Sequence, residues 1–322
     1  MNKRQLGKNG PYLTEIGLGA WAIGGPWQFG WGPQDDQESI KTIHKAIDLG
    51  INWIDTAAVY GLGHSETIVG QAIKNKRSEV FIATKCGQVW NENRKVRTDD
   101  RPEIIRKECE DSLRRLDVDA IDLYQIHWPD PRTNVQDSWG EMVRLKEDGK
   151  VRYIGVSNFG VDLLEKCRAI YPVQSLQPPY SMLHKAKYPQ VENEIITWCE
   201  QNEVGVVAYG PLQNGLLTGK FTHEKLENLA SDDWRHRSEF YKEPLFSQAL
   251  EFVKALKSIA ENYGKSTTEL AIAWVLMNPA LTSAIIGARR PDQVDINVSG
   301  SGWEISREDM EQIQHLIENI HS

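Results

Sequence analysis

Short apolar runs alternate with amphipathic stretches along most of the chain. Runs bounded by turn residues are typical of buried strands, and apolar positions that recur every three to four residues are typical of helices. After a first buried strand at 15–22, the pattern predicts strands at 52–56, 79–85, 121–127, 151–156, 173–177, 204–209 and 283–288. It predicts helices at 37–49, 65–75, 102–116, 135–148, 161–170, 189–202, 246–263, 267–277, 292–299 and 306–320. This strict alternation predicts an α/β fold, a (β/α)8 TIM barrel of parallel strands.

Three segments lie outside this alternation. Residues 5–16 hold Gly, Asn and Pro between two short extended stretches, which predicts an N-terminal β-hairpin lying over one end of the barrel. Residues 210–244 form a long polar insertion, and the last two helices are extra C-terminal elements. Because the length is within the range of one α/β barrel and no internal boundary is evident, we expect residues 1–322 to form a single domain.

Composition narrows the possible partners. The chain is 40% hydrophobic and 25% charged with a formal net charge of −8, as in a soluble globular protein, which argues against nucleic acid or an anionic membrane as a partner. No apolar run reaches the roughly 18 residues of a membrane span. Four cysteines, Cys86, Cys109, Cys167 and Cys199, have no zinc or CxxC spacing. We therefore expect reduced thiols, no metal site and a cytoplasmic location.

One segment matches the residue pattern of a dinucleotide-binding fingerprint but lacks the helix that should follow it. Gly17, Gly19 and Ala22 fit the pattern GxGxxA. That motif requires a helix to begin at its glycines, whereas residues 24–26, Gly-Gly-Pro, continue the loop. A Rossmann domain is therefore not expected.

Candidate catalytic residues follow from the barrel, because active sites of such barrels gather at the carboxyl ends of the strands. Asp55, Lys85 and His127 end three successive strands, and Tyr60 follows the first of them. Lys85 near Tyr60 would favour phenolate and lower a pKa that is ordinarily about 10, while Asp55 would keep the lysine charged. His127 would orient a substrate carbonyl. These four residues are the predicted catalytic set.

Each residue alone also has a structural explanation. Asp55 is compatible with a strand-end cap, Tyr60 with half-buried packing and His127 with a core histidine. Lys85 is also compatible with a Schiff-base aldolase. Their joint occurrence at neighbouring strand ends favours a shared site.

The chain resembles the aldo-keto reductase family from Gln5 to about Asn319, in a form similar to the bacterial branch related to potassium-channel β subunits. The motifs that carry this resemblance are DTAAVYG at 55–61, GHSE at 63–66, ATKCG at 83–87, IDLYQIHWPD at 121–130, GKVRYIGVSNF at 149–159, AYGPLQNGLLTGK at 208–220 and IIGARRPDQV at 285–294. The family's catalytic Asp, Tyr, Lys and His correspond to Asp55, Tyr60, Lys85 and His127.

The resemblance also implies a cofactor, NADP(H), bound across the barrel rim, with NAD(H) less favoured. Ser157, Asn158 and Gln177 would hold the nicotinamide carboxamide, Tyr209 would stack on its ring, and Asp55, Ala20 and Trp21 would border it. The pyrophosphate would lie along Gly210, Pro211, Leu212, Gly215, Leu216 and Lys220. The adenosine end would contact Gly287, Ala288, Arg289, Gln293 and Asn297, with Arg289, or Arg235 and Arg237, supplying charge for a 2′-phosphate.

Without the resemblance, other roles stay open for part of this set. Ser157 and Asn158 could cap the helix at 161–170, and Gln177 could satisfy backbone groups beside the prolines that follow it.

The expected function is NADP(H)-dependent, reversible reduction of aldehyde or ketone carbonyls to alcohols, with Tyr60 as general acid. The alternative is an auxiliary subunit that senses the redox state of its cofactor and turns over slowly. We expect a small carbonyl or alcohol substrate as the partner, in a pocket walled by the Trp-rich loop at 21–31 that suits apolar or sugar-like compounds. The oligomeric state stays open.

Overall fold

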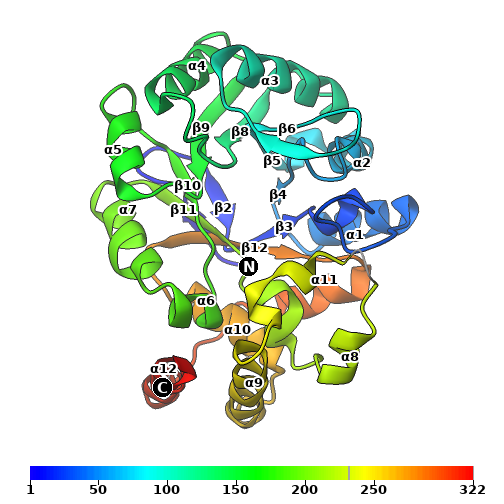
Figure 1. Cartoon of the computed structure of the whole chain (residues 1–322), viewed down its shortest axis with the longest axis vertical. Coiled ribbons are helices and arrows are strands. Elements are labelled where there is room, and N and C mark those ends of the chain that lie inside the picture. The colour runs from blue at the N-terminus through cyan, green and yellow to red at the C-terminus, as the bar shows by residue number, and fades with distance from the viewer. Residues whose placement is uncertain (231–232, 322) are drawn as a thin grey trace.

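A closed barrel of eight parallel strands forms the centre of the protein, as a computed structural model that describes residues 1–230 and 233–321 shows (Figure 1). The strands are β3 (Ile16–Gly19), β4 (Trp53–Asp55), β5 (Phe81–Cys86), β8 (Ile121–Ile126), β9 (Val151–Ser157), β10 (Ser175–Gln177), β11 (Gly205–Tyr209) and β12 (Leu281–Gly287). Strand β12 pairs with β3 to close the ring, with Gly287 opposite Gly19. The predicted (β/α)8 barrel is confirmed.

Helices surround the barrel and bury their apolar faces against it (Figure 1). They are α1 (Asp36–Asp48), α2 (His64–Ile73), α3 (Pro102–Leu116), α4 (Val135–Glu147), α5 (Val161–Arg168), α6 (Met182–Lys187), α7 (Thr197–Gln201), α8 (His223–Glu227), α9 (Leu245–Asn262), α10 (Thr267–Leu276), α11 (Pro291–Val298) and α12 (Arg307–Glu318). The sequence also determines where they begin: Ser266 and Glu269 form a capping box at α10.

One helix differs from its prediction. Instead of one helix at 189–202, the chain forms α6, a π-helical segment at Val191–Ile196 and then α7. Pro189 lies between α6 and the π-helical segment, and a proline interrupts a continuous helix because it has no N–H donor. The earlier start of α6 follows from Ser181, whose side chain accepts a hydrogen bond from the backbone N–H of His184.

The N-terminal hairpin closes one end of the barrel. It consists of β1 (Lys3–Gln5) and β2 (Tyr12–Thr14), which pair antiparallel. Leu6 and Leu13 are almost fully buried in a cluster with Trp53 and Val207 inside the barrel. Backbone contacts to Asn52 and Glu203, which precede strands β4 and β11, place the hairpin at the amino ends of the strands. A ligand must therefore enter from the carboxyl ends.

Two elements border the carboxyl end. The described residues of the predicted insertion, 210–230 and 233–244, include several short helical turns, and Tyr241 is buried with its hydroxyl donating to the carbonyl of Asn214 at 2.9 Å. The loop after β5 forms a second hairpin, β6 (Gln88–Trp90) with β7 (Val96–Thr98), which the sequence did not predict because each strand has only three residues. Neither in these loops nor elsewhere in the described ranges is there a helix long and apolar enough to cross a membrane.

Candidate active site

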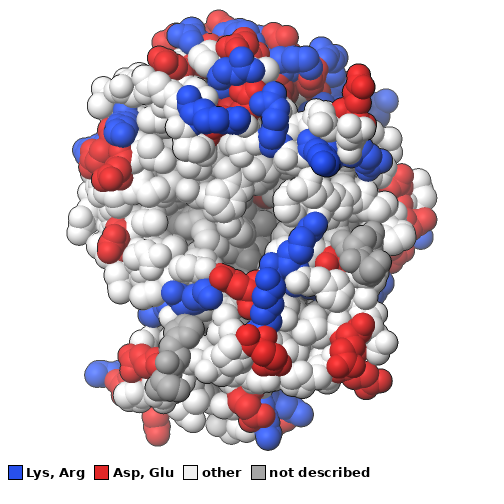
Figure 2. Space-filling view, viewed as in Figure 1, with Lys and Arg blue, Asp and Glu red and all other residues white. Residues whose placement is uncertain are grey.

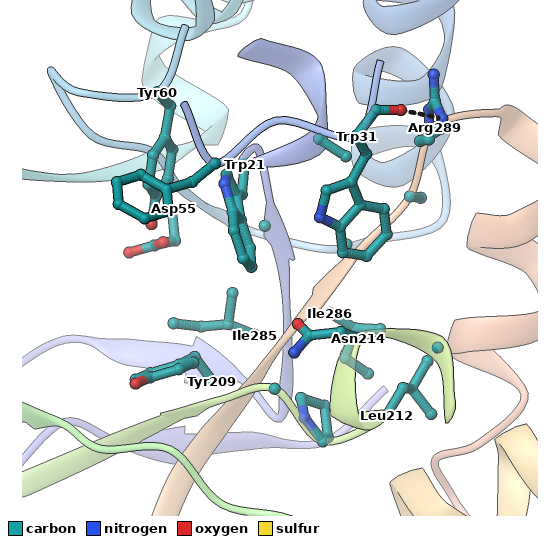
Figure 3. Close-up of a pocket in the computed structure, with 18 of the residues that line it drawn as sticks. Trp21, Trp31, Asp55, Tyr60, Tyr209, Leu212, Asn214, Ile285, Ile286 and Arg289 are labelled. Atoms are coloured by element: carbon teal, nitrogen blue, oxygen red, sulfur yellow. Dashed lines mark hydrogen bonds between the residues drawn. The ribbon is translucent and has the colours of Figure 1, made fainter. Parts of the chain in front are cut away.

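A cavity of about 740 Å³ opens at the carboxyl ends of the barrel strands. Figure 2 shows a hollow at the centre of the molecule with a mostly uncharged rim, and Figure 3 shows the side chains inside it. The residues predicted from the sequence that line this cavity are Trp21, Asp55, Tyr60, His127, Ser157, Asn158, Gln177, Tyr209, Gly210, Pro211, Leu212, Gly215, Lys220, Arg237, Gly287, Ala288, Arg289, Gln293 and Asn297.

Four predicted residues are not part of the lining: Ala20, Lys85, Leu216 and Arg235. Lys85 is buried just beneath the cavity, where it contacts Tyr60. Ala20 is fully buried and fixes the neighbouring strand end by donating its N–H to the carbonyl of Asp55 at 2.8 Å. Leu216 packs in the hydrophobic core.

Arg235 is held by the protein itself. Its guanidinium forms an ion pair with Asp233 at 2.6 Å and lies 5.0 Å above the ring of Trp31 and 5.2 Å above the ring of Phe221. These contacts join the insertion to the loop that follows β3. In this arrangement Arg235 supports an aromatic wall of the cavity.

Lys85 lies at the centre of a buried polar group. Its Nζ donates to Asp55 Oδ2 at 2.7 Å, to the Thr56 carbonyl at 2.8 Å and to Tyr60 Oη at 3.2 Å. The register explains this proximity, because Asp55 pairs with Ala83, two residues before Lys85 on β5. The ring of His127 lies edge-on to Tyr60, with 5.7 Å between the ring centres. The four predicted side chains therefore converge at one point of the cavity.

Burial dominates the electrostatics of this group. It raises the pKa of Asp55 and lowers the pKa of Lys85, and the attraction between the two charges opposes both shifts. Burial lowers the pKa of His127 well below its usual value, and the Lys85 charge lowers it further. The imidazole is therefore neutral at neutral pH.

Tyr60 corrects one expectation from the sequence. Burial raises the pKa of Tyr60 well above its usual value, and the Asp55 carboxylate raises it further. Lys85 does not lower the pKa of Tyr60 as expected, because the Asp55 carboxylate, 2.7 Å from the ammonium, compensates its charge. In the protein without ligand the side chain is a protonated phenol at neutral pH, which is the form that donates a proton.

Polar side chains at the ends of β9 and β10 form a network beside this group. Gln177 Nε2 donates to Asp55 Oδ1 at 2.8 Å, and Ser157 Oγ donates to the Gln177 carbonyl at 2.8 Å. Asn158 has a left-handed backbone with φ of 62°, and its Oδ1 accepts from Tyr209 Oη at 2.9 Å. Helix α5 begins at Val161, and its N-cap residue is Gly160, which provides no side-chain hydrogen bond. The role of Ser157 and Asn158 as helix caps is therefore ruled out.

Basic residues mark the other end of the cavity. Arg289 Nε donates to Gln34 Oε1 at 2.7 Å, and its Nη1 donates to the Trp31 carbonyl at 3.2 Å, the contact that is dashed in Figure 3. Gln293 Oε1 accepts from the backbone N–H of Arg289 at 2.7 Å. Within the described part of the chain, no carboxylate forms an ion pair with Arg289 or Lys220. Both cations are available to an anionic ligand.

Sequence reasoning missed several lining residues. Gln88, Asn214 and Trp234 were not predicted to bind a ligand, although all three line the cavity. Asn214 follows Gln213, and both have a left-handed backbone, with φ of 55° and 45°. An Asn before Gly is a signal of such a turn, since Asn tolerates this conformation better than most residues. Gln88 belongs to the hairpin that the sequence did not reveal.

Comparisons with known proteins identify the family to which the chain belongs. The sequence profile of the Aldo/keto reductase family matches residues 15–318. The aldo-keto reductase YhdN of Bacillus subtilis (strain 168) is 39% identical over 100% of this chain and 95% of its own length, and the NADH-specific methylglyoxal reductase of Escherichia coli (strain K12) is 34% identical over 99% of each. The structure of a glycerol dehydrogenase from Gluconobacter oxydans matches with a TM-score of 0.87 and 40% identity, covering 98% of this chain and 94% of the other. The chain therefore belongs to the aldo/keto reductase family of oxidoreductases.

Proposed function

We propose that the protein is an NADP(H)-dependent reductase that converts aldehyde or ketone carbonyls to alcohols reversibly, with Tyr60 as general acid. The observation that carries the proposal is the convergence of Tyr60 with Lys85 at 3.2 Å and with the ring of His127, at a cavity of about 740 Å³. A phenol supported by a buried ammonium beside a neutral imidazole is suited to proton transfer at a carbonyl oxygen.

A reduced nicotinamide, when bound, supplies a hydride to the carbonyl carbon. The residues present fit this group at both ends of the cavity. The amide side chains of Asn158 and Gln177 would hold its carboxamide, and the ring of Tyr209 would lie against the nicotinamide. At the other end, the cations of Lys220 and Arg289 would contact phosphates.

The chain's own groups would carry the proton. Neutral His127 and the Tyr60 phenol both donate hydrogen bonds to the substrate's carbonyl oxygen, which fixes its orientation. As the C=O double bond becomes a single bond, the Tyr60 proton passes to that oxygen, and the alcohol forms. The phenolate left behind is stabilised by the Lys85 ammonium at 3.2 Å. In alcohol oxidation the same phenolate takes the proton back.

The preference for NADP(H) rests on Arg289. Three of its donors contact Gln34, Trp31 and Pro33, and these contacts hold the guanidinium in place at the cavity. Since a guanidinium has five N–H donors, two are left for a 2′-phosphate. One relative is by its name NADH-specific, so the choice between the cofactors is a testable part of the proposal.

The test is turnover of a reactive aromatic aldehyde with NADPH and with NADH, after tryptophan fluorescence titration with each cofactor. We expect NADPH to bind more tightly and to be oxidised as the aldehyde is reduced. Tight binding without turnover across a panel of carbonyl compounds would instead support a cofactor-sensing subunit. Trapping of a covalent adduct on Lys85 by borohydride and substrate would support a Schiff-base enzyme.

A further inference from the structure

The first turn of helix α2 holds together the ends of three barrel strands. Ser65 Oγ donates to the carbonyl of Ala20 at 2.8 Å and lies 2.9 Å from Thr56 Oγ1. Glu66 Oε1 accepts a hydrogen bond from Thr84 Oγ1 at 2.6 Å. Ala20 and Thr56 directly follow β3 and β4, and Thr84 belongs to β5. Two consecutive residues of the GHSE motif therefore join strand ends that carry part of the catalytic group, although the chemistry proposed above gives them no role.

Glu66 is a fully buried charge with a partner on each carboxylate oxygen. Helices α2 and α3 lie side by side outside the barrel (Figure 1), and Arg115 of α3 donates its Nε to Glu66 Oε2 at 2.6 Å. A buried ion pair is often no more stabilising than apolar side chains of the same volume. Packing of the two helices therefore does not by itself explain a charge at this position, and its place relative to Lys85 offers another explanation.

The Glu66 carboxylate lies behind the strand that carries Lys85. Thr84 and Lys85 are consecutive in β5, and successive side chains of a strand point to opposite faces. Lys85 therefore reaches into the barrel toward Asp55, whereas Thr84 faces α2. Burial lowers the pKa of Lys85, while the charges of Asp55 and Glu66 both raise it. The ammonium thus has one carboxylate on each side of the barrel wall.

The remaining titratable groups face this arrangement from both sides of the barrel wall. Inside, Tyr60 and His127 lie beside the ammonium and are uncharged at neutral pH. Outside, Arg115 pairs with Glu66. Glu108 of α3 lies on the same side, where burial and, to a smaller extent, the charge of Glu66 raise its pKa to about 8. At neutral pH Glu108 is therefore protonated and adds no charge to that of Glu66.

We propose that Glu66 is a positioning residue for carbonyl reduction: its buried carboxylate fixes the end of β5 through Thr84 and keeps Lys85 charged beside Tyr60. The inference rests on the reductase function proposed above and extends it to a residue outside the cavity. Glu66 does not line the cavity, so it acts on the reaction only through Lys85. Loss of its charge should therefore weaken the stabilisation of the Tyr60 phenolate without changing the contacts of substrate or cofactor.

The test compares two variants that break the same ion pair. Glu66→Gln removes its negative charge, whereas Arg115→Gln removes its positive charge and keeps the carboxylate. The measured quantities are the single-turnover rate of aldehyde reduction as a function of pH and the cofactor affinity from tryptophan fluorescence. Glu66→Gln should lower the rate at neutral pH by about tenfold to a hundredfold and leave cofactor affinity unchanged. It should also move the alkaline loss of activity to lower pH, because Lys85 gives up its proton more readily. Arg115→Gln should not move this loss to lower pH, and Glu108 titrates in both variants, so its effect cancels.

Thr84 provides a second test that changes no charge and decides the question even if Glu66→Gln fails to fold. Thr84→Val removes the hydroxyl that donates to Glu66, and Thr84→Ser keeps the hydroxyl but loses a buried methyl group. We expect Thr84→Val to lower the rate by about threefold to tenfold and Thr84→Ser to keep nearly the wild-type rate, although both should lower the unfolding free energy. Equal rates of the two Thr84 variants would overturn the inference, and so would a pH profile of Glu66→Gln that matches that of Arg115→Gln. Absence of wild-type turnover with either cofactor would instead contradict the proposed function itself.

Discussion

Lys85 Nζ and Tyr60 Oη lie 3.2 Å apart at the buried base of the cavity. The lysine is fixed there from behind by Asp55, at 2.7 Å, and both charged side chains are almost fully buried. The contact places a positive charge next to the one oxygen that would become negative when the phenol gives up its proton. The proposed proton transfer from Tyr60 depends on this contact.

Removal of the Lys85 charge should slow the chemical step and leave cofactor binding nearly unchanged. Lys85→Met is expected to lower kcat by about 10²–10⁴-fold, since the phenolate loses its stabilising ammonium. Cofactor affinity should change little, because Lys85 does not line the cavity. Single-turnover kinetics and fluorescence titration give the two quantities. A variant with wild-type kcat would show that Lys85 does not assist Tyr60.

The same substitution tests the buried ion pair. Lys85→Met leaves the Asp55 carboxylate unpaired, which should lower the free energy of unfolding by about 3–5 kcal/mol. The double variant Asp55→Asn with Lys85→Met should regain part of this loss, yet remain inactive. Denaturant unfolding of the single and double variants measures both effects. If the double variant loses more unfolding free energy than the two single variants lose together, the ion pair is not the source of the loss.

Arg289 should determine the cofactor preference. Arg289→Gln is expected to reduce the affinity for NADPH by about tenfold and to leave the affinity for NADH nearly unchanged, because only NADPH carries the 2′-phosphate. Arg290→Gln is the matched control, since Arg290 is exposed and paired with Asp292. Titration of both variants with both cofactors gives the comparison. Equal losses for NADPH and NADH would place the 2′-phosphate elsewhere.

The rate of carbonyl reduction should be insensitive to pH around neutrality. The pKa of Tyr60 is raised, so the acid stays protonated up to at least about pH 9, and the pKa of His127 is lowered, so the imidazole stays neutral above about pH 6.5. Alcohol oxidation requires the phenolate and should accelerate as pH rises. Rates of both directions across this range test the assignment. A reduction rate that falls between about pH 7 and pH 8 would contradict it.

A buried carboxyl next to the barrel should make stability depend on pH. Burial raises the pKa of Glu108 to about 8, and its Oε2 accepts from the backbone N–H of Gly87 at 2.7 Å. A carboxyl whose pKa is raised by folding stabilises the protein at low pH, and this contribution is lost as pH rises from about 4.5 through 8. Relative to Glu108→Gln, wild-type protein should lose up to about 5 kcal/mol of unfolding free energy over that interval. The unfolding free energy of both proteins is measured across this pH range. If Glu108 were charged throughout, the difference between the two proteins would not change with pH.

The strand positions of the site could be predicted from the sequence for a physical reason. Each of Asp55, Lys85 and His127 lies at or next to the end of a predicted buried strand, and parallel strands bring such ends to one rim. The barrel followed from the same alternation. These are properties of the local pattern, so a single sequence is enough to reveal them.

The rest depends on contacts between distant segments. Arg235 stacks on Trp31, which is far away in the sequence, and also pairs with its neighbour Asp233. These contacts determine that this cation does not line the cavity, and no local pattern shows the stacking. The raised pKa of Tyr60 depends on its burial and on the charge of Asp55. The hairpin containing Gln88 is stabilised by tertiary contacts of strands too short to show a period.

The most direct test of the central claim is Tyr60→Phe, which removes one hydroxyl and keeps the ring. Cofactor affinity is measured by tryptophan fluorescence, and aldehyde reduction by loss of the reduced nicotinamide absorbance in the same sample. We expect unchanged affinity for NADPH and a kcat lowered by at least about 10²-fold. Turnover at the wild-type rate would show that another group supplies the proton.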